Sequence, residues 1–470
     1  MTADVRDALV RGELPQLDGQ ALGAWVVEQR WFGSKAREVV SLGVLDVLPL
    51  RFEPQLLASV MVEARFAPGT HEVYQVPVAV RPTEDHWKEG VIAQAGGLTF
   101  HDALADPEQG LALLELMRAG ARLESEQAAS EFHWVDGTRD PGPTATVRPM
   151  GAEQSNSSLV FDEALVLKLY RRVEAGINPE LELLRFLTER GFESVPALGG
   201  WYDYTGRLME ATLGLMQEFL SGARDGWELA LEELSTDPDA FLERVRALGE
   251  VTGRLHSVLG SDASNPAFAP EEPSAESLGL LTATVDEEIE RIFVELPEEE
   301  SVEPIAGRGE EVREQLRLLT HVGSAGKVIR THGDYHLGQT MLSERGWVLL
   351  DFEGEPARSL PERRRKRSPL RDVAGMLRSF AYAASASEIL RGVQPPEDWE
   401  ARAREEFLEA YLDSADPSLL PAGRHGVEQL LSVFELEKAV YELRYEMNNR
   451  PDWVRIPVAG ILRLLEVPAR

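Results

Sequence analysis

Residues 331–340, with the sequence THGDYHLGQT, constrain the fold of this chain more than any other feature. Asp334 is followed five residues later by the carboxamide Gln339, and a hydrophobic run then leads into Asp351 of the sequence DFEGEP. Kinase-type enzymes use this order of groups, with one carboxylate on a loop, a carboxamide five residues later, and a second Asp after a β-hairpin. The spacing therefore predicts a phosphoryl-transfer centre in which Asp334 orients the acceptor hydroxyl.

The residue types fit the charge that such a reaction creates. Transfer of a γ-phosphoryl group gathers negative charge between nucleotide and acceptor, and hard oxygen ligands that hold Mg²⁺ neutralise it. We expect Gln339, Asp351 and Glu353 to be those ligands, with a hairpin turn at residues 343–346 before Asp351. The alternative is that His332, Asp334 and their neighbours are only polar residues on a loop between buried strands.

Composition limits the class of protein. A chain of 470 residues with 43% hydrophobic residues is long for one core, so we expect two or three subdomains. We place them at residues 1–90 (a cap), 91–219 (an intermediate part and a nucleotide-binding lobe) and 220–470 (a helical lobe with the catalytic loop).

No run approaches the roughly 18 apolar residues that span a bilayer, and no signal peptide begins the chain. The absence of cysteine fits the cytoplasmic location that we expect.

The net charge of −32 argues against nucleic acid and anionic membranes as partners, because both are bound through clustered Lys and Arg. The basic run at residues 363–367 is the local exception. We favour a role beside the catalytic segment, where it compensates acidic charge or borders phosphates, over a nucleic-acid or localisation signal. The acidic run at residues 286–303 is interpreted as a solvated helix and loop.

Hydrophobic periodicity predicts the main elements. A helix is expected near residues 22–27, followed by strands at 39–47, 57–66 and 73–80. Further helices are predicted at 106–117, 180–187, 241–259, from 368 through 379, and at 427–448. His256, inside one of them, is expected to be a packed structural residue.

A hairpin at residues 159–170 is the predicted nucleotide-binding element. The loop before it, residues 151–158, carries hydroxyl and amide groups that can face phosphates, namely Ser155, Asn156, Ser157 and Ser158. Lys168 lies in an apolar strand, where its charge needs a partner. We favour Glu182 on the following helix as that partner, with Glu180 as the alternative. A further possibility is that Lys168 lies on an edge strand and reaches solvent without a partner.

The strand near residues 215–220 leads into a Gly-containing segment, as the hinge between two kinase lobes does. Backbone groups of Gln217, Glu218 and Phe219 are therefore expected to be available to an adenine edge.

The chain resembles the bacterial maltokinases, within the aminoglycoside-phosphotransferase-like kinases. The resemblance rests on QRWFGSK at residues 29–35, EQSNSSL at 153–159, HGDYHLGQ, DFEGEP, SPLRDVAGMLR at 368–378, YELRYE at 441–446 and NRPDW at 449–453. It implies an α+β, bilobed protein-kinase-like fold with an N-terminal α/β cap and a mainly helical C-terminal lobe. It also implies ATP-dependent phosphorylation of maltose at the anomeric hydroxyl, with Mg²⁺, to give maltose 1-phosphate for α-glucan synthesis.

The last long helix is expected to border the sugar. Lys438, Tyr441, Glu442 and Tyr445 follow the spacing i, i+3, i+4, i+7, which places them on one helix face. In the family this helix borders the disaccharide site, and His336 is a further candidate for contact with the sugar. The alternative is a half-buried helix face that is satisfied by internal hydrogen bonds.

Two other functions stay open. One is a glucosamine or aminoglycoside kinase, which needs more acidic residues facing an amino sugar. The other is a catalytically weak pseudokinase that binds a trehalose-metabolising partner such as trehalose synthase. Retention of Lys168, Asp334, Gln339 and Asp351 argues against the pseudokinase.

Overall fold

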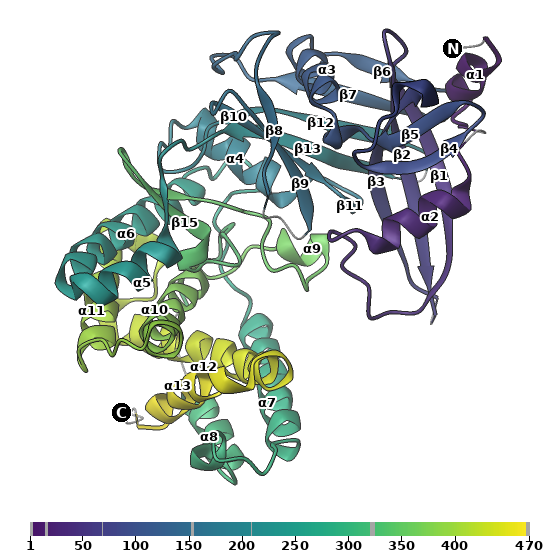
Figure 1. Cartoon of the computed structure of the whole chain (residues 1–470). Coiled ribbons are helices and arrows are strands. Elements are labelled where there is room, and N and C mark those ends of the chain that lie inside the picture. Colours follow the sequence, from purple (N-terminus) through teal and green to yellow (C-terminus); the bar gives the residue numbers. More distant parts are fainter. Residues whose placement is uncertain are drawn as a thin grey trace. The chain divides into compact units, whose positions relative to one another are not determined.

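The computed structural model describes residues 3–14, 17–67, 69–151, 155–207, 209–319 and 325–466. The chain folds into two compact units, which are described separately below (Figure 1). The first unit comprises Met1–Thr188 and Pro196–Ser221, and the second comprises Glu189–Val195 and Gly222–Arg470. The three-part division predicted from the sequence is finer than these two units and stays a prediction. No helix in the described ranges is long and apolar enough to cross a membrane.

An antiparallel sheet forms the N-terminal part of the first unit. Its strands run in the order β1-β2-β3-β5-β4, and α2 lies across it in Figure 1. Asp18 caps α2 by accepting a hydrogen bond of 3.0 Å from the Gln20 amide. The elements are α1 (Ala3–Val10), α2 (Gly19–Glu28), β1 (Val39–Arg51), β2 (Leu56–Phe66), β3 (His71–Pro82), β4 (Val91–Ala95) and β5 (Leu98–Asp102).

A second sheet completes the first unit, with strand order β6-β7-β12-β13-β10-β9-β8. Its elements are α3 (Pro107–Arg118), β6 (Arg122–Glu124), β7 (Ala128–Trp134), β8 (Val147–Pro149), β9 (Asn156–Phe161), β10 (Leu165–Tyr170), β11 (Arg172–Val173), α4 (Pro179–Glu189), β12 (Leu198–Gly206) and β13 (Glu210–Glu218). The chain leaves β10 and forms β11, which pairs with β3 of the first sheet. One hydrophobic cluster includes residues of both sheets and of α3, so the two sheets share a core.

The second unit is mainly helical. It also contains a small sheet, β14-β15-β16, whose strands β15 and β16 lie between α8 and α9 in the chain. The elements are β14 (Arg224–Asp225), α5 (Gly226–Thr236), α6 (Pro238–Leu259), α7 (Ala275–Val294), α8 (Gly309–Leu319), β15 (Thr340–Ser343), β16 (Gly346–Leu349), α9 (Leu360–Arg363), α10 (Leu370–Arg391), α11 (Trp399–Ser414), α12 (Gly423–Asn449) and α13 (Arg455–Glu466). Apolar residues of α7, α8, α12 and α13 form one buried cluster, and Figure 1 shows these helices together.

Local sequence signals explain where the elements near the site begin and turn. The hairpin predicted at residues 343–346 is confirmed, because Ser343 pairs with Gly346 and β15 with β16. Gly346 has a φ of +99°, a conformation that is open to glycine and rare for other residues. Each predicted helix is present, and α10 extends well past residue 379, to Arg391.

Candidate active site

The Asp372 carboxylate holds the backbone of the loop that carries Asp334. The amides of His332 and Gly333 donate hydrogen bonds of 2.8 Å and 3.0 Å to its two oxygens. Asp372 lies in the first turn of α10 and is only 3% exposed. A buried carboxylate is stable when donors satisfy it, so the loop and the start of α10 fix each other.

His256 completes the surroundings of Asp372. Its Nε2 lies 3.1 Å from the Asp372 carboxylate, and its Nδ1 lies 3.0 Å from the Tyr411 hydroxyl. Burial alone raises the pKa of Asp372, but the hydrogen bond and charge of His256, the charge of His332 and the Gly333 amide bring that pKa below its usual value. The prediction that His256 is a packed structural residue is confirmed by its complete burial.

His332 joins the catalytic loop to the segment after β16. Its Nε2 lies 2.7 Å from the Leu350 carbonyl oxygen, and its ring lies 4.7 Å from that of Phe352, measured between centroids. Since a carbonyl only accepts, Nε2 carries the proton in this contact. Asp351 lies between these two contacted residues, so His332 holds its segment against the loop that bears Asp334.

Asp351 and Gln339 lie side by side. The Gln339 amide nitrogen donates to an Asp351 carboxylate oxygen over 3.1 Å. Asp351 has a φ of +60°, an uncommon conformation for a residue other than glycine and one that gathers at functional sites. Glu353 offers a carboxylate oxygen within 4.8 Å of one of Asp351. Oxygen donors of this kind suit Mg²⁺, so the three predicted metal ligands fit the ion.

Asp334 faces the ammonium group of Lys438, with 3.7 Å between Oδ1 and Nζ. Burial alone lowers the pKa of Lys438, but the carboxylates of Asp334, Glu442 and Glu355 raise that pKa above its usual value. Lys438 is therefore a permanent positive charge beside the candidate catalytic carboxylate.

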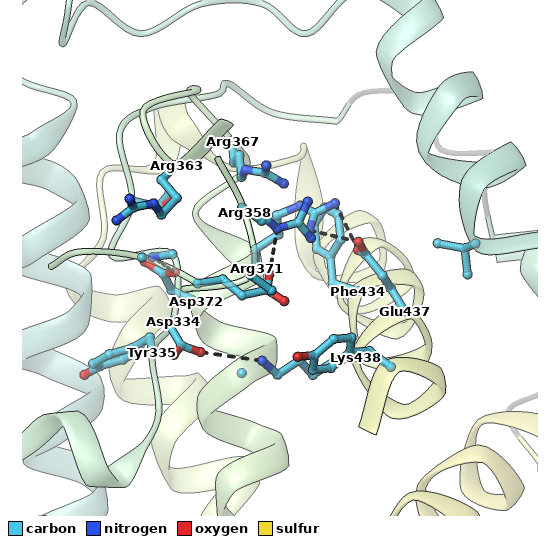
Figure 2. A pocket seen from close by; sticks show the side chains of 18 of the residues that line it. Asp334, Tyr335, Arg358, Arg363, Arg367, Arg371, Asp372, Phe434, Glu437 and Lys438 are labelled. Atoms are coloured by element: carbon cyan, nitrogen blue, oxygen red, sulfur yellow. Dashed lines mark hydrogen bonds and ion pairs between the residues drawn. The ribbon is translucent and has the colours of Figure 1, made fainter. Parts of the chain in front are cut away.

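A cavity of about 310 Å³ lies beside Asp334 within the second unit. Its walls come from α7, the catalytic loop, residues 354–375 and α12 (Figure 2). The charged residues that line it are Glu288, Asp334, Glu355, Arg358, Arg363, Arg367, Arg371, Asp372, Glu437, Lys438 and Arg444.

The carboxylates of this cavity already have cationic or amide partners. Asp372 is used by the catalytic loop, as described above. The other four lie against cations: Asp334 against Lys438 at 3.7 Å, Glu355 against Arg358 at 2.6 Å, Glu437 against Arg371 at 2.9 Å, and Glu288 against Arg444 at 2.6 Å. A ligand that brings its own positive charge therefore finds its potential carboxylate partners neutralised.

The face of α12 that lines the cavity differs from the predicted one. Lys438 and Tyr441 line it, as expected, whereas Glu442 and Tyr445 do not. Glu442 is 7% exposed and accepts hydrogen bonds of 3.0 Å and 2.7 Å from Arg378, which is buried on α10. Tyr445 is 45% exposed. Successive helix residues turn by about 100°, and the face of α12 that lines the cavity is rotated toward Glu437. The predicted contact of Glu442 and Tyr445 with a sugar is therefore not supported by this geometry.

His336 also lies outside the residues that line the cavity. Its Nδ1 accepts a hydrogen bond of 3.1 Å from the Gly338 amide and thereby caps the short turn Leu337–Gln339. Burial lowers the pKa of His336, although Asp334 opposes this. In the structure His336 shapes the turn that presents Gln339, and its predicted contact with a sugar is not supported by this geometry.

The arginines of the cavity, and Glu288 and Glu437, were not predicted as site residues. The available signal was the basic run at residues 363–367, placed directly after DFEGEP. Its local interpretation is supported, because Arg363 and Arg367 line the cavity and Lys366 forms an ion pair with Glu271. The acidic run was interpreted as solvated, yet its Glu288 faces the cavity.

In the first unit, Lys168 pairs with Glu180. The distance from Nζ to Oε2 is 2.9 Å, and the Tyr170 hydroxyl donates to the same oxygen over 2.9 Å. The preferred partner, Glu182, was therefore wrong, and the alternative, Glu180, is the one observed. Residues two apart on a helix point in different directions, and Glu180, whose amide is capped by Asn178 at 2.8 Å, is the one that faces β10.

Part of the predicted phosphate loop is a strand. Residues 152–154 lie outside the described residues, Ser155 precedes β9, and β9 begins at Asn156. Ser158 is opposite Lys168 in the register, so their side chains share a face, as do those of Asn156 and Tyr170. Ser157 points to the other face and accepts a hydrogen bond of 2.8 Å from Arg171. A site built around Lys168 therefore includes Ser158 and excludes Ser157.

Two backbone amides of the predicted hinge are already used. The Glu218 amide donates to the Ala197 carbonyl and the Phe219 amide to the Ala164 carbonyl, each over 2.9 Å. Since an amide N–H makes one strong hydrogen bond, these two amides are not available to an adenine edge, and the contribution of the other backbone groups of residues 217–219 stays a prediction. Gln217 lies in β13, where its side chain shares the face of Lys168.

The fold, with Asp334 on the catalytic loop and Asp351 after the hairpin, defines a small-molecule phosphotransferase with a kinase-like fold. Residues 144–418 match the phosphotransferase enzyme family, and residues 25–106 match the maltokinase N-terminal cap domain. The first match spans more than half of the chain, so the chain belongs to the phosphotransferase enzyme family. The predicted fold class is confirmed as a kinase-like fold with a β-rich N-terminal cap and a helical C-terminal region.

Named relatives and a solved structure are similar over most of the chain. A glucosamine kinase from Mycolicibacterium smegmatis is 27% identical over 331 residues, which cover 68% of this chain and 79% of the relative. A glucosamine kinase from Streptacidiphilus jiangxiensis is 25% identical over 339 residues, which cover 69% and 74%. The structure of a glucosamine kinase with glucosamine, ADP and inorganic phosphate has a TM-score of 0.70 at 19% identity and covers 96% of this chain and 100% of that one. This structural likeness shows the fold alone.

Proposed function

We propose that this chain transfers the γ-phosphoryl group of ATP to the anomeric hydroxyl of maltose, which gives maltose 1-phosphate and ADP. The observation that carries the choice of a neutral acceptor is the cavity beside Asp334, where the carboxylates are already paired. The match of residues 25–106 to the maltokinase cap supports maltose in particular.

Asp334 is the proposed general base. As the acceptor oxygen attacks the γ-phosphorus, its proton passes to the Asp334 carboxylate, and the bond from the γ-phosphorus to the bridging oxygen of ADP breaks. At 3.7 Å, Lys438 is too far away to hydrogen-bond to Asp334, so the carboxylate oxygens stay accessible to a hydroxyl. The fixed charge of Lys438 offsets part of the negative charge of the transferred group.

Asp351, Gln339 and Glu353 are the residues proposed to hold Mg²⁺. When bound, the ion neutralises charge on the β- and γ-phosphates. The contact between Gln339 and Asp351 orients the carboxylate before any ligand arrives. In the first unit we assign Lys168, held by Glu180, to the nucleotide phosphates, with Ser158 on the same strand face.

Gln217 is a further proposed nucleotide contact. Its side chain shares the face of Lys168, and its Oε1 is buried without a hydrogen-bond partner in the described part of the chain. A buried polar atom without a partner is costly, so a ligand donor that reaches this oxygen stabilises both groups.

Glucosamine is the second candidate acceptor, because both curated relatives quoted above are glucosamine kinases. An ammonium group is bound best by a carboxylate that lacks another cation, and the paired carboxylates of this cavity disfavour it. The pseudokinase alternative, with a trehalose synthase as partner, is disfavoured by the intact contacts of Lys168, Asp334 and Asp351.

Steady-state rates with maltose, glucose, glucosamine and kanamycin test the proposal. ADP release is followed at saturating MgATP, with the Asp334→Asn variant as the blank for ATP hydrolysis. The proposal requires the largest kcat/KM with maltose. A larger kcat/KM with glucosamine favours the second candidate, and no turnover with any acceptor favours the pseudokinase.

A further inference from the structure

Arg367 stands out among the cations of the cavity. Within the described ranges, no carboxylate oxygen lies within 4.0 Å of its guanidinium, which donates one long hydrogen bond of 3.4 Å to the Glu362 carbonyl. Its neighbours Arg358 and Arg371 each have a carboxylate of their own, Glu355 and Glu437. Arg367 is therefore a surplus positive charge in the cavity wall.

The surroundings make this charge costly. Burial, and then the charges of Arg371 and Arg358, lower the pKa of Arg367 to about 10, although Glu437 and Glu355 oppose the shift. An arginine remains protonated at neutral pH even so. Its positive charge is thus held beside two others in a partly buried place, an arrangement that an anion relieves.

The backbone presents Arg367 from a fixed position. Its amide donates to the Ile329 carbonyl over 2.8 Å, and the Ile329 amide donates to the Arg367 carbonyl over 2.9 Å. Ile329 is fully buried just before the catalytic loop. In the view of Figure 2, Arg358 and Arg367 lie at the top of the cavity, and Asp334 and Lys438 lie at the bottom.

We propose that Arg367, flanked by Arg358 and Arg371, forms an anion subsite in this cavity that binds a phosphate group. The planar guanidinium matches the oxygens of a phosphate in a two-point contact, which a lysine cannot reproduce. The phosphate is carried on a sugar or is free inorganic phosphate. The subsite goes beyond the proposed reaction, because it does not depend on which sugar is phosphorylated.

The subsite has a consequence for turnover. The same cavity contains Asp334 and is the proposed place of the acceptor, so a phosphate ligand held at Arg367 competes with the acceptor for space. Inhibition by phosphate or by a sugar phosphate is therefore expected to be competitive with the acceptor and not with ATP.

Isothermal titration of the full-length chain tests the subsite. Sodium phosphate and glucose 6-phosphate are titrated in separate experiments with saturating MgADP present, so that the nucleotide site is filled. The variants are Arg367→Gln, Arg367→Lys and the matched control Arg365→Gln, which removes the same charge at an exposed position outside the cavity. We expect saturable binding of at least one ligand to the wild type, and the tighter of the two identifies the source of the phosphate.

Arg367→Gln should weaken that binding roughly tenfold or more, and Arg365→Gln should leave it within about twofold. Arg367→Lys should fall between wild type and Arg367→Gln, and it preserves the test if the neutral variant does not fold. Equal affinities for wild type and a folded Arg367 variant, or no saturable binding at millimolar ligand, overturn the subsite. The titration needs no turnover, so it stands or fails independently of maltose as acceptor.

Discussion

At the scale of single residues, Asp334 differs from the other paired carboxylates of the cavity. Glu288, Glu355 and Glu437 lie within 3.0 Å of a guanidinium, whereas the cation nearest to Asp334 is an ammonium group at 3.7 Å. The closer pairs hold their carboxylates in hydrogen bonds. Asp334 keeps its oxygens accessible, which is what a group that receives a proton from a hydroxyl requires.

Asp334→Asn should therefore reduce kcat by roughly 10²–10⁴-fold, the usual contribution of a general base, and leave the affinity for ATP within a few-fold of wild type. The coupled ADP assay measures the rate, and equilibrium titration measures nucleotide binding. Asp452→Asn, at an exposed carboxylate outside the cavity, is the matched control and should keep full activity. A rate for Asp334→Asn within tenfold of wild type would show that another group accepts the proton.

Two tyrosines of α12 separate a sugar contact from a surface role. Tyr441 lines the cavity and Tyr445 does not. Tyr441→Phe should raise the KM for maltose about five- to tenfold, the effect of losing one hydrogen bond, and spare the KM for ATP. Tyr445→Phe should change neither. Equal effects of both substitutions on maltose kinetics would contradict the assignment of the cavity as the acceptor site.

Asp351 and Gln339 should differ in their contribution to metal binding. Asp351→Ala removes an ionised carboxylate and Gln339→Ala a neutral carboxamide, and a hard cation is held more strongly by the former. The Mg²⁺ concentration for half-maximal rate should rise in both variants, and more in Asp351→Ala. Unchanged half-saturation in both would exclude these two side chains as ligands.

At the scale of elements, the sequence predicted where helices lie along the chain better than which face of each helix turns inward. The periodicity of α12 and the cap of α4 were sufficient to place both helices. Periodicity and capping could not decide between Glu180 and Glu182, or exclude Glu442 from the cavity, because the facing partners Tyr170 and Arg378 lie on other elements. Which face of a helix is buried is decided by tertiary packing, which local pattern does not contain.

Strand register limited the prediction of the nucleotide-binding part in the same way. The Ser-rich segment was interpreted as a loop from its composition, but pairing with β10 extends β9 back to Asn156. The catalytic loop was predictable because its function depends on fixed spacing between Asp334, Gln339 and Asp351. The arginines of the cavity were not, since arginine is common on surfaces and only the fold shows which ones turn inward.

The link between α10 and the catalytic loop gives a prediction for stability. The folded pKa of Asp372 lies below its usual value of 3.8, so its stabilising effect is present above that pH and is lost as pH falls through the folded pKa. Asp372→Asn should lower the free energy of unfolding by about 2–4 kcal/mol near pH 7, because it weakens buried charged hydrogen bonds. The difference from wild type should shrink below about pH 4.

Urea denaturation of both proteins between about pH 3 and pH 7 measures this difference. A pH-independent difference would contradict the ionised state of Asp372 in the fold. No difference at neutral pH would contradict its role in holding the loop.

At the scale of the whole molecule, the net charge conceals the character of the site. The chain carries −32 overall, yet the cavity beside Asp334 has each of its carboxylates partnered and Arg367 in surplus. Composition disfavours nucleic acid as a partner, but it carries no information on the sign of a local site. The choice between a neutral and a cationic acceptor depends on that local sign.

The most direct test of that choice is a competition in one reaction. Equimolar maltose and glucosamine, each below its KM, are incubated with the enzyme and MgATP, and both phosphorylated products are quantified by mass spectrometry. A monosaccharide leaves unpaired the polar groups that bind the second glucosyl ring of maltose. Two such groups, at ~1–3 kcal/mol each, predict a preference for maltose of roughly a hundredfold. Glucosamine phosphate formed in equal or greater amount than maltose phosphate would contradict the account and assign the cavity to an amino sugar.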